Sequence, residues 1–390
     1  MYASFATMFR RLLMLASTVL LTACASAPPT VQFDAARLAE VDGAISALVA
    51  RHATPGAQFH LERDGAVFER SYGNISYGQP EPITADTLFD VASLSKVLAT
   101  APSVLLLAEE GKLDLEAPLA RYLPECGSRG RDGITVRHLL THSSGFPAGL
   151  PARPAWEGRA AALALACGID PTDPPGTLFR YSDINYILLG IIVEQVSGQS
   201  LDRFAAERIF TPLKMTQTGF LPLQRYSAAR IAPTQFSPEG ELLQGVVHDP
   251  TARRMGGVAG SAGVFSTTRD IARFVRMLLA GGELDGVRVL SPDSVRLLTT
   301  VQSPLGLAQR AMGMDIGSSF ARPRGTIFPA GSYGHTGYTG CFLWIDPTSR
   351  TFDIFLSNRV YPDDKSIILP FYVELGTLAA RAAGLPDRPQ

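Results

Sequence analysis

The stretch Ser93-Leu94-Ser95-Lys96 joins a polar approach, Asp90-Val91-Ala92, to a long apolar run from Val97 to Leu107. The apolar run predicts a buried helix with Ser93 in its first turn. Residues three apart share one face of a helix, so we expect the Ser93 hydroxyl and the Lys96 amine to meet. A serine attacks as a nucleophile once a base removes its proton. A lysine serves as that base only where burial or a neighbouring charge lowers its pKa.

Two further motifs follow this stretch in order. Tyr181-Ser182-Asp183 comes after a loop rich in proline and glycine, and His335-Thr336-Gly337 lies in a late strand pattern between Gly334 and Gly340. Alone, Ser-x-x-Lys also describes an N-capping serine followed by a solvated lysine. Lys96 is the only lysine of the chain with a serine three positions earlier. The three motifs together therefore favour a catalytic serine.

The ordered motifs resemble the active-site elements of the penicillin-recognising serine hydrolases, in the branch of class C β-lactamases, related esterases and low-molecular-weight penicillin-binding proteins. Three more stretches match this branch, and the last of them, with Val247-His248-Asp249 before it, is most similar to its DD-carboxypeptidase-like members. The resemblance spans about residues 35–385. It implies an α+β fold, with an antiparallel sheet flanked by helices and a mostly helical inserted subdomain. The three stretches are Thr135 to Gly145, Pro175 to Tyr186 and Gly256 to Thr267.

The resemblance also implies a chemistry. Ser93 attacks a carbonyl and forms an acyl-enzyme that water hydrolyses, while Lys96 and Tyr181 share the proton transfer. The backbone N–H groups of Ser93 and Tyr338 form the oxyanion hole. Thr336 and Gly337 lie beside the substrate.

The chain departs from the β-lactamase pattern at two positions. Asp183 stands where an asparagine that contacts the substrate is usual, and His335 replaces a lysine. Histidine is a weaker, pH-dependent cation for a substrate carboxylate. Both changes argue against efficient β-lactam hydrolysis. A shifted register would align Ser182-Asp183-Ile184 with the Ser-Asp-Asn motif of other branches, but the flanking residues favour the Tyr181 form.

The leading interpretation is therefore a serine hydrolase that acts through acyl-Ser93 on peptidoglycan peptides, as a DD-carboxypeptidase does. A carboxylesterase for small esters is the alternative, and a lipoprotein that binds cell-wall peptide without turnover is the alternative from another class. We expect no cofactor and no metal, because Leu139 stands between His138 and His142 where a zinc protease needs glutamate. A net charge of -1 gives no reason to expect a nucleic-acid partner.

The first residues have the pattern of an export signal. Arg10-Arg11 precede an apolar run that ends in Leu21-Thr22-Ala23-Cys24, which resembles a lipobox. We expect a signal peptide over 1–23, a lipid on Cys24 and a tether over 24–33, with Met8 as an alternative start to Met1. Ser26 favours the outer membrane, facing the periplasm, because an aspartate there indicates retention at the inner membrane.

One domain is expected over 34–385. A helix is predicted over 34–52, a hairpin around Asp64-Gly65, and a mostly helical insertion over about 111–233. Three late strand patterns and a closing helix from about Lys365 to Ala383 follow, so both ends of the chain should contribute to one sheet. Cys126 and Cys167 lie in one region, but the sequence leaves open whether they form a disulfide.

Overall fold

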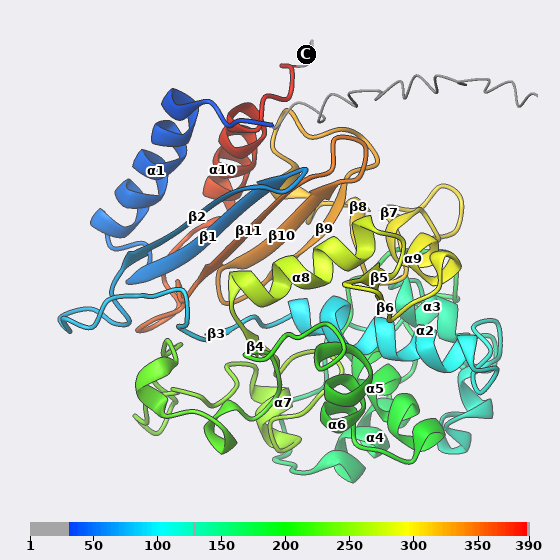
Figure 1. Cartoon of the computed structure of the whole chain (residues 1–390). Helices are drawn as coiled ribbons and strands as arrows, with labels where there is room; N and C mark the ends of the chain where they lie inside the picture. The colour runs from blue at the N-terminus through cyan, green and yellow to red at the C-terminus, as the bar shows by residue number, and fades with distance from the viewer. Residues whose placement is uncertain (1–30, 128–129, 388–390) are drawn as a thin grey trace, which may run out of the picture. The chain divides into compact units, whose positions relative to one another are not determined.

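The computed structural model describes residues 31–127 and 130–387. Its centre is a seven-stranded antiparallel sheet in the order β2-β1-β11-β10-β9-β8-β7 (Figure 1). The first two strands and the last three come from opposite ends of the chain, as predicted. The strands are β1 (Gly56–Arg63), β2 (Ala66–Gly73), β7 (Gln309–Arg310), β8 (Asp315–Gly317), β9 (Tyr333–Gly337), β10 (Cys341–Asp346) and β11 (Thr351–Ser357).

The predicted hairpin is confirmed. Arg63 pairs with Ala66, so Asp64 and Gly65 alone make the turn between β1 and β2. Both have positive φ, 47° and 84°, which a tight two-residue hairpin turn requires and which Asp-Gly supplies at low cost. This local chemistry fixes the register of the first two strands.

Two helices cover one face of the sheet, α1 (Ala35–Ala50) and α10 (Leu369–Ala382) (Figure 1). Their apolar residues pack against Phe342 and Phe355 of the sheet. The closing helix begins at Leu369, four residues later than predicted, because Pro370 in its first turn favours a helix start and has no N–H to satisfy. Residues 365–368 therefore remain a loop.

The other face of the sheet meets α8 (Thr268–Leu279) and a large helical part. Between β3 (Phe89–Asp90) and β4 (Phe265–Ser266) the described residues form helices, turns and isolated bridges, and the predicted helical insertion lies within this part. A disulfide between Cys126 and Cys167 links the 3-10 helix Pro124–Cys126 to α4. The remaining α-helices and strands are α2 (Ala101–Glu109), α3 (Val136–Leu140), α4 (Arg159–Gly168), α5 (Asp183–Ser197), α6 (Leu201–Ala205), α7 (Pro250–Arg254), β5 (Glu283–Leu284), β6 (Val287–Arg288) and α9 (Pro292–Thr299).

The predicted signal peptide and Cys24 lie outside the described residues. Among the residues that are described, no helix is both long enough and apolar enough to span a membrane.

Candidate active site

Ser93 lies in the turn that precedes a helix, whereas the sequence predicted that it lies in the first turn of the helix itself. The helix opens with a π-helical turn over Lys96–Thr100 and continues as α2. Ala92 has a φ of 47°, which is uncommon for a residue with a side chain. The buried carboxylate of Asp90 accepts a hydrogen bond of 2.8 Å from the Ala92 N–H and helps to hold this turn. The nucleophile position is thus held in a backbone conformation that an ordinary helix start does not have.

The predicted meeting of Ser93 and Lys96 is confirmed. The Lys96 Nζ donates to Ser93 Oγ at 2.9 Å and to the Ser261 carbonyl at 2.8 Å, and it lies 2.7 Å from an Asp183 carboxylate oxygen. Lys96 is fully buried, whereas Ser93 is half-buried at the cleft. Asp183, the first residue of α5, therefore contacts the lysine and is not among the residues that line the cleft.

The charge of Lys96 differs from the expectation for a lysine base. Burial lowers the pKa of Lys96, but the Asp183 carboxylate and Tyr181 beside it outweigh this effect and hold the pKa above its ordinary value. Lys96 is therefore an ammonium group in this state, which donates a hydrogen bond to Ser93 and cannot take its proton directly.

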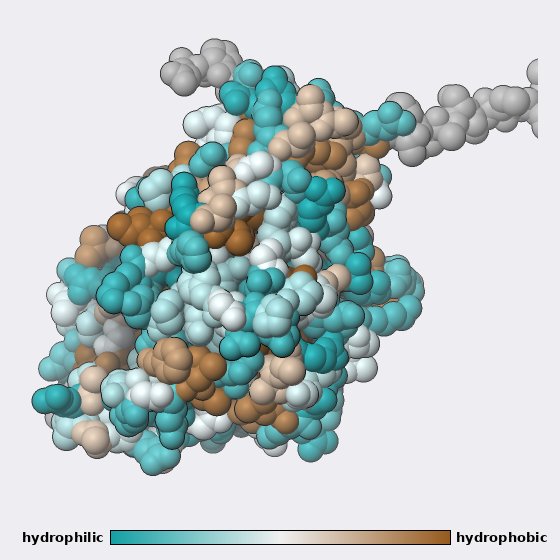
Figure 2. Space-filling view, turned by 90° about the vertical axis from the view of Figure 1, so that its left-hand side faces the viewer, coloured by the Kyte–Doolittle hydropathy of each residue, from teal (hydrophilic) through white to brown (hydrophobic). Residues whose placement is uncertain are grey.

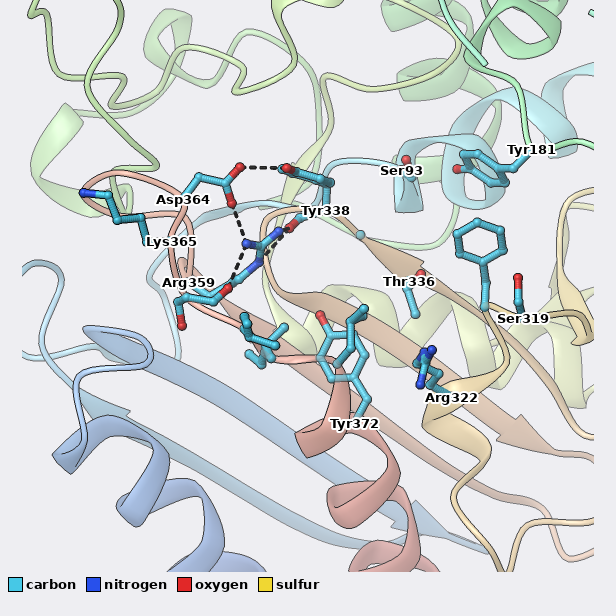
Figure 3. Close-up of a pocket in the computed structure, with 16 residues that line it drawn as sticks. Ser93, Tyr181, Ser319, Arg322, Thr336, Tyr338, Arg359, Asp364, Lys365 and Tyr372 are labelled. Atoms are coloured by element: carbon cyan, nitrogen blue, oxygen red, sulfur yellow. Dashed lines mark hydrogen bonds and ion pairs between the residues drawn. The ribbon is translucent and has the colours of Figure 1, made fainter. Parts of the chain in front are cut away.

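Tyr181 completes the group around the serine. Its ring stacks on the His142 imidazole with centroids 4.4 Å apart, and the Lys96 Nζ lies 5.1 Å from its ring centroid. The Tyr181 hydroxyl points toward Ser93 (Figure 3). Tyr181, Lys96 and Asp183 thus form one connected group that can accept and return a proton.

The end of β9 lies against the nucleophile turn. A Cβ on Gly337 would come within 2.4 Å of the Val91 carbonyl oxygen, so only glycine allows this approach. The Thr339 hydroxyl donates to the Asp90 carbonyl at 2.6 Å. These contacts bring the Ser93 and Tyr338 segments together at one cleft, as the predicted oxyanion hole requires.

Tyr338 is 59% exposed and is nevertheless held on several sides. The Arg359 guanidinium donates to its carbonyl at 2.6 and 3.0 Å, and the Tyr338 hydroxyl donates to Asp364 at 2.7 Å (Figure 3). The His248 ring stacks on its ring with centroids 5.6 Å apart. These contacts fix the residue whose N–H is the second predicted oxyanion donor.

His335 does not have the role expected from the sequence. It is 3% exposed and is not among the cleft-lining residues. Burial, together with the positive charges of Arg310 and Lys96, holds the pKa of His335 well below its usual range. Its Nδ1 donates to the Thr336 carbonyl at 2.8 Å. His335 is therefore a neutral, buried group at neutral pH and not the cation that binds a substrate carboxylate.

The cleft contains a cation that the sequence did not indicate. It has a volume of about 580 Å³, with Ser93, Tyr181 and Thr336 along one side and Tyr372 on another (Figure 3). Arg359 and Lys365 each pair with an aspartate, Asp364 and Asp363. Arg322 is the one remaining lysine or arginine of the cleft wall, and within the described residues its guanidinium has no carboxylate partner. It begins a short 3-10 helix, Arg322–Arg324, with no motif around it, so only the fold reveals it.

A protein-family model described as Beta-lactamase matches residues 41–376. The chain belongs to the beta-lactamase family. With the Ser93 and Lys96 motif in place, it is a serine hydrolase of this family.

Relatives with similar sequences are described as D-alanyl-D-alanine carboxypeptidases. A "Putative D-alanyl-D-alanine carboxypeptidase" of Escherichia coli O157:H7 is 33% identical over 378 residues, which cover 86% of this chain and 85% of the relative. A relative with the same description from Salmonella agona is 29% identical over 398 residues, which cover 88% of this chain and 90% of the relative.

Solved structures share the fold. A beta-lactamase-like protein from Bacteroides dorei has a TM-score of 0.70 at 21% identity and covers 90% of this chain and 100% of its own. EstCE1, "a hydrolase with promiscuous acyltransferase activity", has a TM-score of 0.70 at 21% identity. The match covers 88% of this chain and 98% of EstCE1. At these identities the structures support the fold alone.

Proposed function

We propose that the protein removes a C-terminal D-alanine from peptidoglycan peptides through an acyl-Ser93 intermediate. Ser93 Oγ attacks the carbonyl carbon of the scissile amide while Lys96 Nζ passes one of its protons to the Asp183 carboxylate and takes the serine proton in its place, within the group that also contains Tyr181. That group returns the proton to the amine of the departing D-alanine. Water then gives a proton to the same group as it adds to the acyl carbon, and that proton returns to Ser93 Oγ as the bond between the acyl carbon and Ser93 breaks. The backbone N–H groups of Ser93 and Tyr338 stabilise the oxyanion in both steps.

The unpaired guanidinium of Arg322 is the observation that carries this proposal. A carboxypeptidase substrate ends in a carboxylate close to the bond that breaks, and a guanidinium binds a carboxylate with paired hydrogen bonds. Arg322 lines the same cleft as Ser93 and Thr336. The descriptions of the relatives at 29–33% identity agree with this substrate class.

A small-ester carboxylesterase is the second candidate. The cleft also has an apolar wall from Ile367, Leu369 and Tyr372, and Ile367 is 78% exposed. Such a wall suits the aliphatic part of an ester, which needs no cation.

The nucleophile is tested first, by intact-protein mass spectrometry after treatment with a fluorophosphonate and, separately, with a penicillin. One adduct on Ser93 is expected from the fluorophosphonate, and none in Ser93→Ala, which should still fold because a half-buried serine adds little packing. A folded wild type that neither reagent labels would instead support a binding lipoprotein without turnover.

The substrate class is tested by the ratio of two activities in Arg322→Gln and Arg322→Lys. D-alanine release from a peptide that ends in D-Ala-D-Ala should fall at least about 100-fold in Arg322→Gln, because a charge-assisted pair is lost. Cleavage of p-nitrophenyl acetate, which has no carboxylate, should change little. Equal losses for both substrates, or no peptide activity in a wild type that cleaves the ester, would favour the esterase.

We also propose that a lipid on Cys24 anchors the chain in the outer membrane, facing the periplasm. The Cys126–Cys167 disulfide supports export, since such bonds persist mainly in oxidising compartments. Incorporation of labelled palmitate should depend on Cys24 and be absent in Cys24→Ser.

A further inference from the structure

A second hollow of about 360 Å³ adjoins the catalytic cleft. Lys365, Ser366 and Ile367 line both spaces, so the loop that follows β11 forms the partition between them. Ser93 and Arg322 lie toward one side of the view and Lys365 lies toward the other (Figure 3). A chain held by Arg322 at its end and by Ser93 near that end would leave the cleft toward the second hollow.

Aromatic side chains from four segments form a row, of which three line this hollow and the fourth, Phe236, lies beside it. The ring centroids of His52 and Tyr77 lie 4.9 Å apart, those of Tyr77 and Tyr361 5.8 Å apart, and those of Tyr361 and Phe236 6.3 Å apart. We call His52, Tyr77, Tyr361 and Phe236 the aromatic row. The loops that carry Tyr77 and Tyr361 lie on the side of the molecule that faces the viewer in Figure 2, where polar and apolar residues alternate.

The row is built into the fold although it lies at the surface. The Tyr77 hydroxyl donates to the His52 carbonyl at 2.7 Å, and the Phe236 N–H donates to the Pro362 carbonyl at 3.2 Å. The buried Asn358 side chain donates to the Ile75 and Pro233 carbonyls at 2.9 and 3.0 Å, which ties the three loops together. The positions of the rings are thus set before anything binds.

The four rings do not contribute to the hydrophobic core. None belongs to a buried apolar cluster of the described residues, and Phe236 is 46% exposed. Around them lie polar groups, Arg51, Asp363 and Ser366. Flat apolar faces beside hydrogen-bonding groups match a ligand that has both kinds of surface.

We propose that the aromatic row binds sugar rings of a glycan strand whose attached peptide occupies the catalytic cleft. A pyranose ring presents an apolar C–H face that packs on an aromatic ring, and its edge of hydroxyl and amide groups needs hydrogen-bond partners. The inference rests on the proposed peptidoglycan activity, because the shared partition places the sugar and the peptide on either side of Lys365, Ser366 and Ile367. The preferred substrate is then a peptide still joined to its sugar.

Binding is tested without turnover by calorimetry on the full chain with tetra-N-acetylchitotetraose, a sugar oligomer that carries no peptide. Tyr361→Leu keeps bulk but loses the flat ring, and His52→Asn loses the ring at a position whose φ of 58° asparagine tolerates. Each variant should weaken binding about tenfold, as expected for the loss of one aromatic contact. Tyr361→Phe should restore it, and Tyr226→Leu, outside both hollows, should bind as wild type does.

Turnover tests the link between the two spaces. The kcat/KM for a disaccharide-linked pentapeptide should exceed that for the free pentapeptide by about tenfold, and this ratio should fall to near one in Tyr361→Leu, with p-nitrophenyl acetate cleavage unchanged. No binding of the oligomer, or equal binding by wild type and Tyr361→Leu, would overturn the sugar site. A wild-type ratio near one would overturn its link to the cleft. Sugar binding by a protein whose Ser93 resists both labelling reagents would instead overturn the proposed function and leave the sugar site standing.

Discussion

The buried environment of His335 should make the stability of this protein depend on pH. An unfolded histidine takes up a proton near pH 6.5, whereas folded His335 stays neutral until well below that value because it is buried near Arg310 and Lys96. Below pH 6.5 the unfolded state therefore binds more protons, and the free energy of unfolding falls as the pH falls. His335 should contribute a loss of about 1 kcal/mol between pH 6.5 and 5.5.

Urea unfolding of wild type and His335→Gln at pH 7.5, 6.5 and 5.5 measures this contribution. Between pH 6.5 and 5.5 the free energy of unfolding should fall more in the wild type than in the variant, whatever the absolute stability of each protein. His142 is present in both proteins, and burial, the largest cause of its low pKa, acts in both. Parallel losses in the two proteins would show that His335 is protonated in the folded state.

At the residue scale, the sequence predicted contacts that depend on local geometry. Ser93 and Lys96 meet because they are three positions apart near a helix start. The ion pair of Lys96 with Asp183 joins residues 87 positions apart by number and decides the charge of the lysine, so no local pattern could indicate it. The sequence did not indicate Arg322 either, because its place in the cleft of Ser93 depends on contacts between distant parts of the chain.

At the element scale, Lys96 is positioned by the segment before β4, which crosses α5 in close contact. The Gly260 carbonyl accepts a hydrogen bond of 2.8 Å from the Thr100 hydroxyl, and the next residue, Ser261, accepts one from Lys96. A Cβ on Gly260 would lie 1.9 Å from the Tyr186 carbonyl oxygen of α5. The glycine-rich stretch that marks the family in the sequence therefore has a packing cause, a close contact with a helix some 70 residues earlier.

Gly260→Ala should therefore destabilise the protein by about 1–3 kcal/mol or more, as overpacking against backbone does. Gly43→Ala is the matched control, because Gly43 lies within α1 and an added Cβ meets no atom within 4 Å. That change should be neutral or stabilising by up to about 1 kcal/mol. Urea unfolding followed by circular dichroism measures both, and equal midpoints for the two variants would contradict the packing argument.

Helix and strand limits followed the sequence closely where local chemistry sets them, as in the Asp64-Gly65 turn. They were less accurate at the starts of two helices. The apolar run that begins at Val97 predicted a helix but not that its first turn, Lys96–Thr100, is π-helical, and the closing helix begins after the loop 365–368, which lines the cleft. The sequence likewise showed that both chain ends join one sheet but not that the order is β2-β1-β11-β10, since pairing of distant strands depends on the whole fold.

At the scale of the whole molecule, the Cys126–Cys167 disulfide closes a loop of 41 residues within the helical part. Cross-linking a loop of this length restricts the unfolded chain and should stabilise the fold by about 2–4 kcal/mol. The helical part and the sheet share one large apolar cluster, in which Leu343 of β10 and Leu105 of α2 both take part. We therefore expect the disulfide to stabilise the sheet as well as the helices around it.

The double variant Cys126→Ala/Cys167→Ala should unfold at a lower urea concentration than the wild type, with one transition seen both by far-UV circular dichroism and by tryptophan fluorescence. Both proteins carry Trp156→Phe, because Trp156 is the other tryptophan of the chain and lies between the two cysteines in sequence, so the fluorescence of Trp344 in β10 reports on the sheet. Dithiothreitol should lower the midpoint of the wild type and leave that of the double variant unchanged. Two separate transitions would mean that the helical part unfolds alone, and the cleft between it and β9 would then be lost before the sheet.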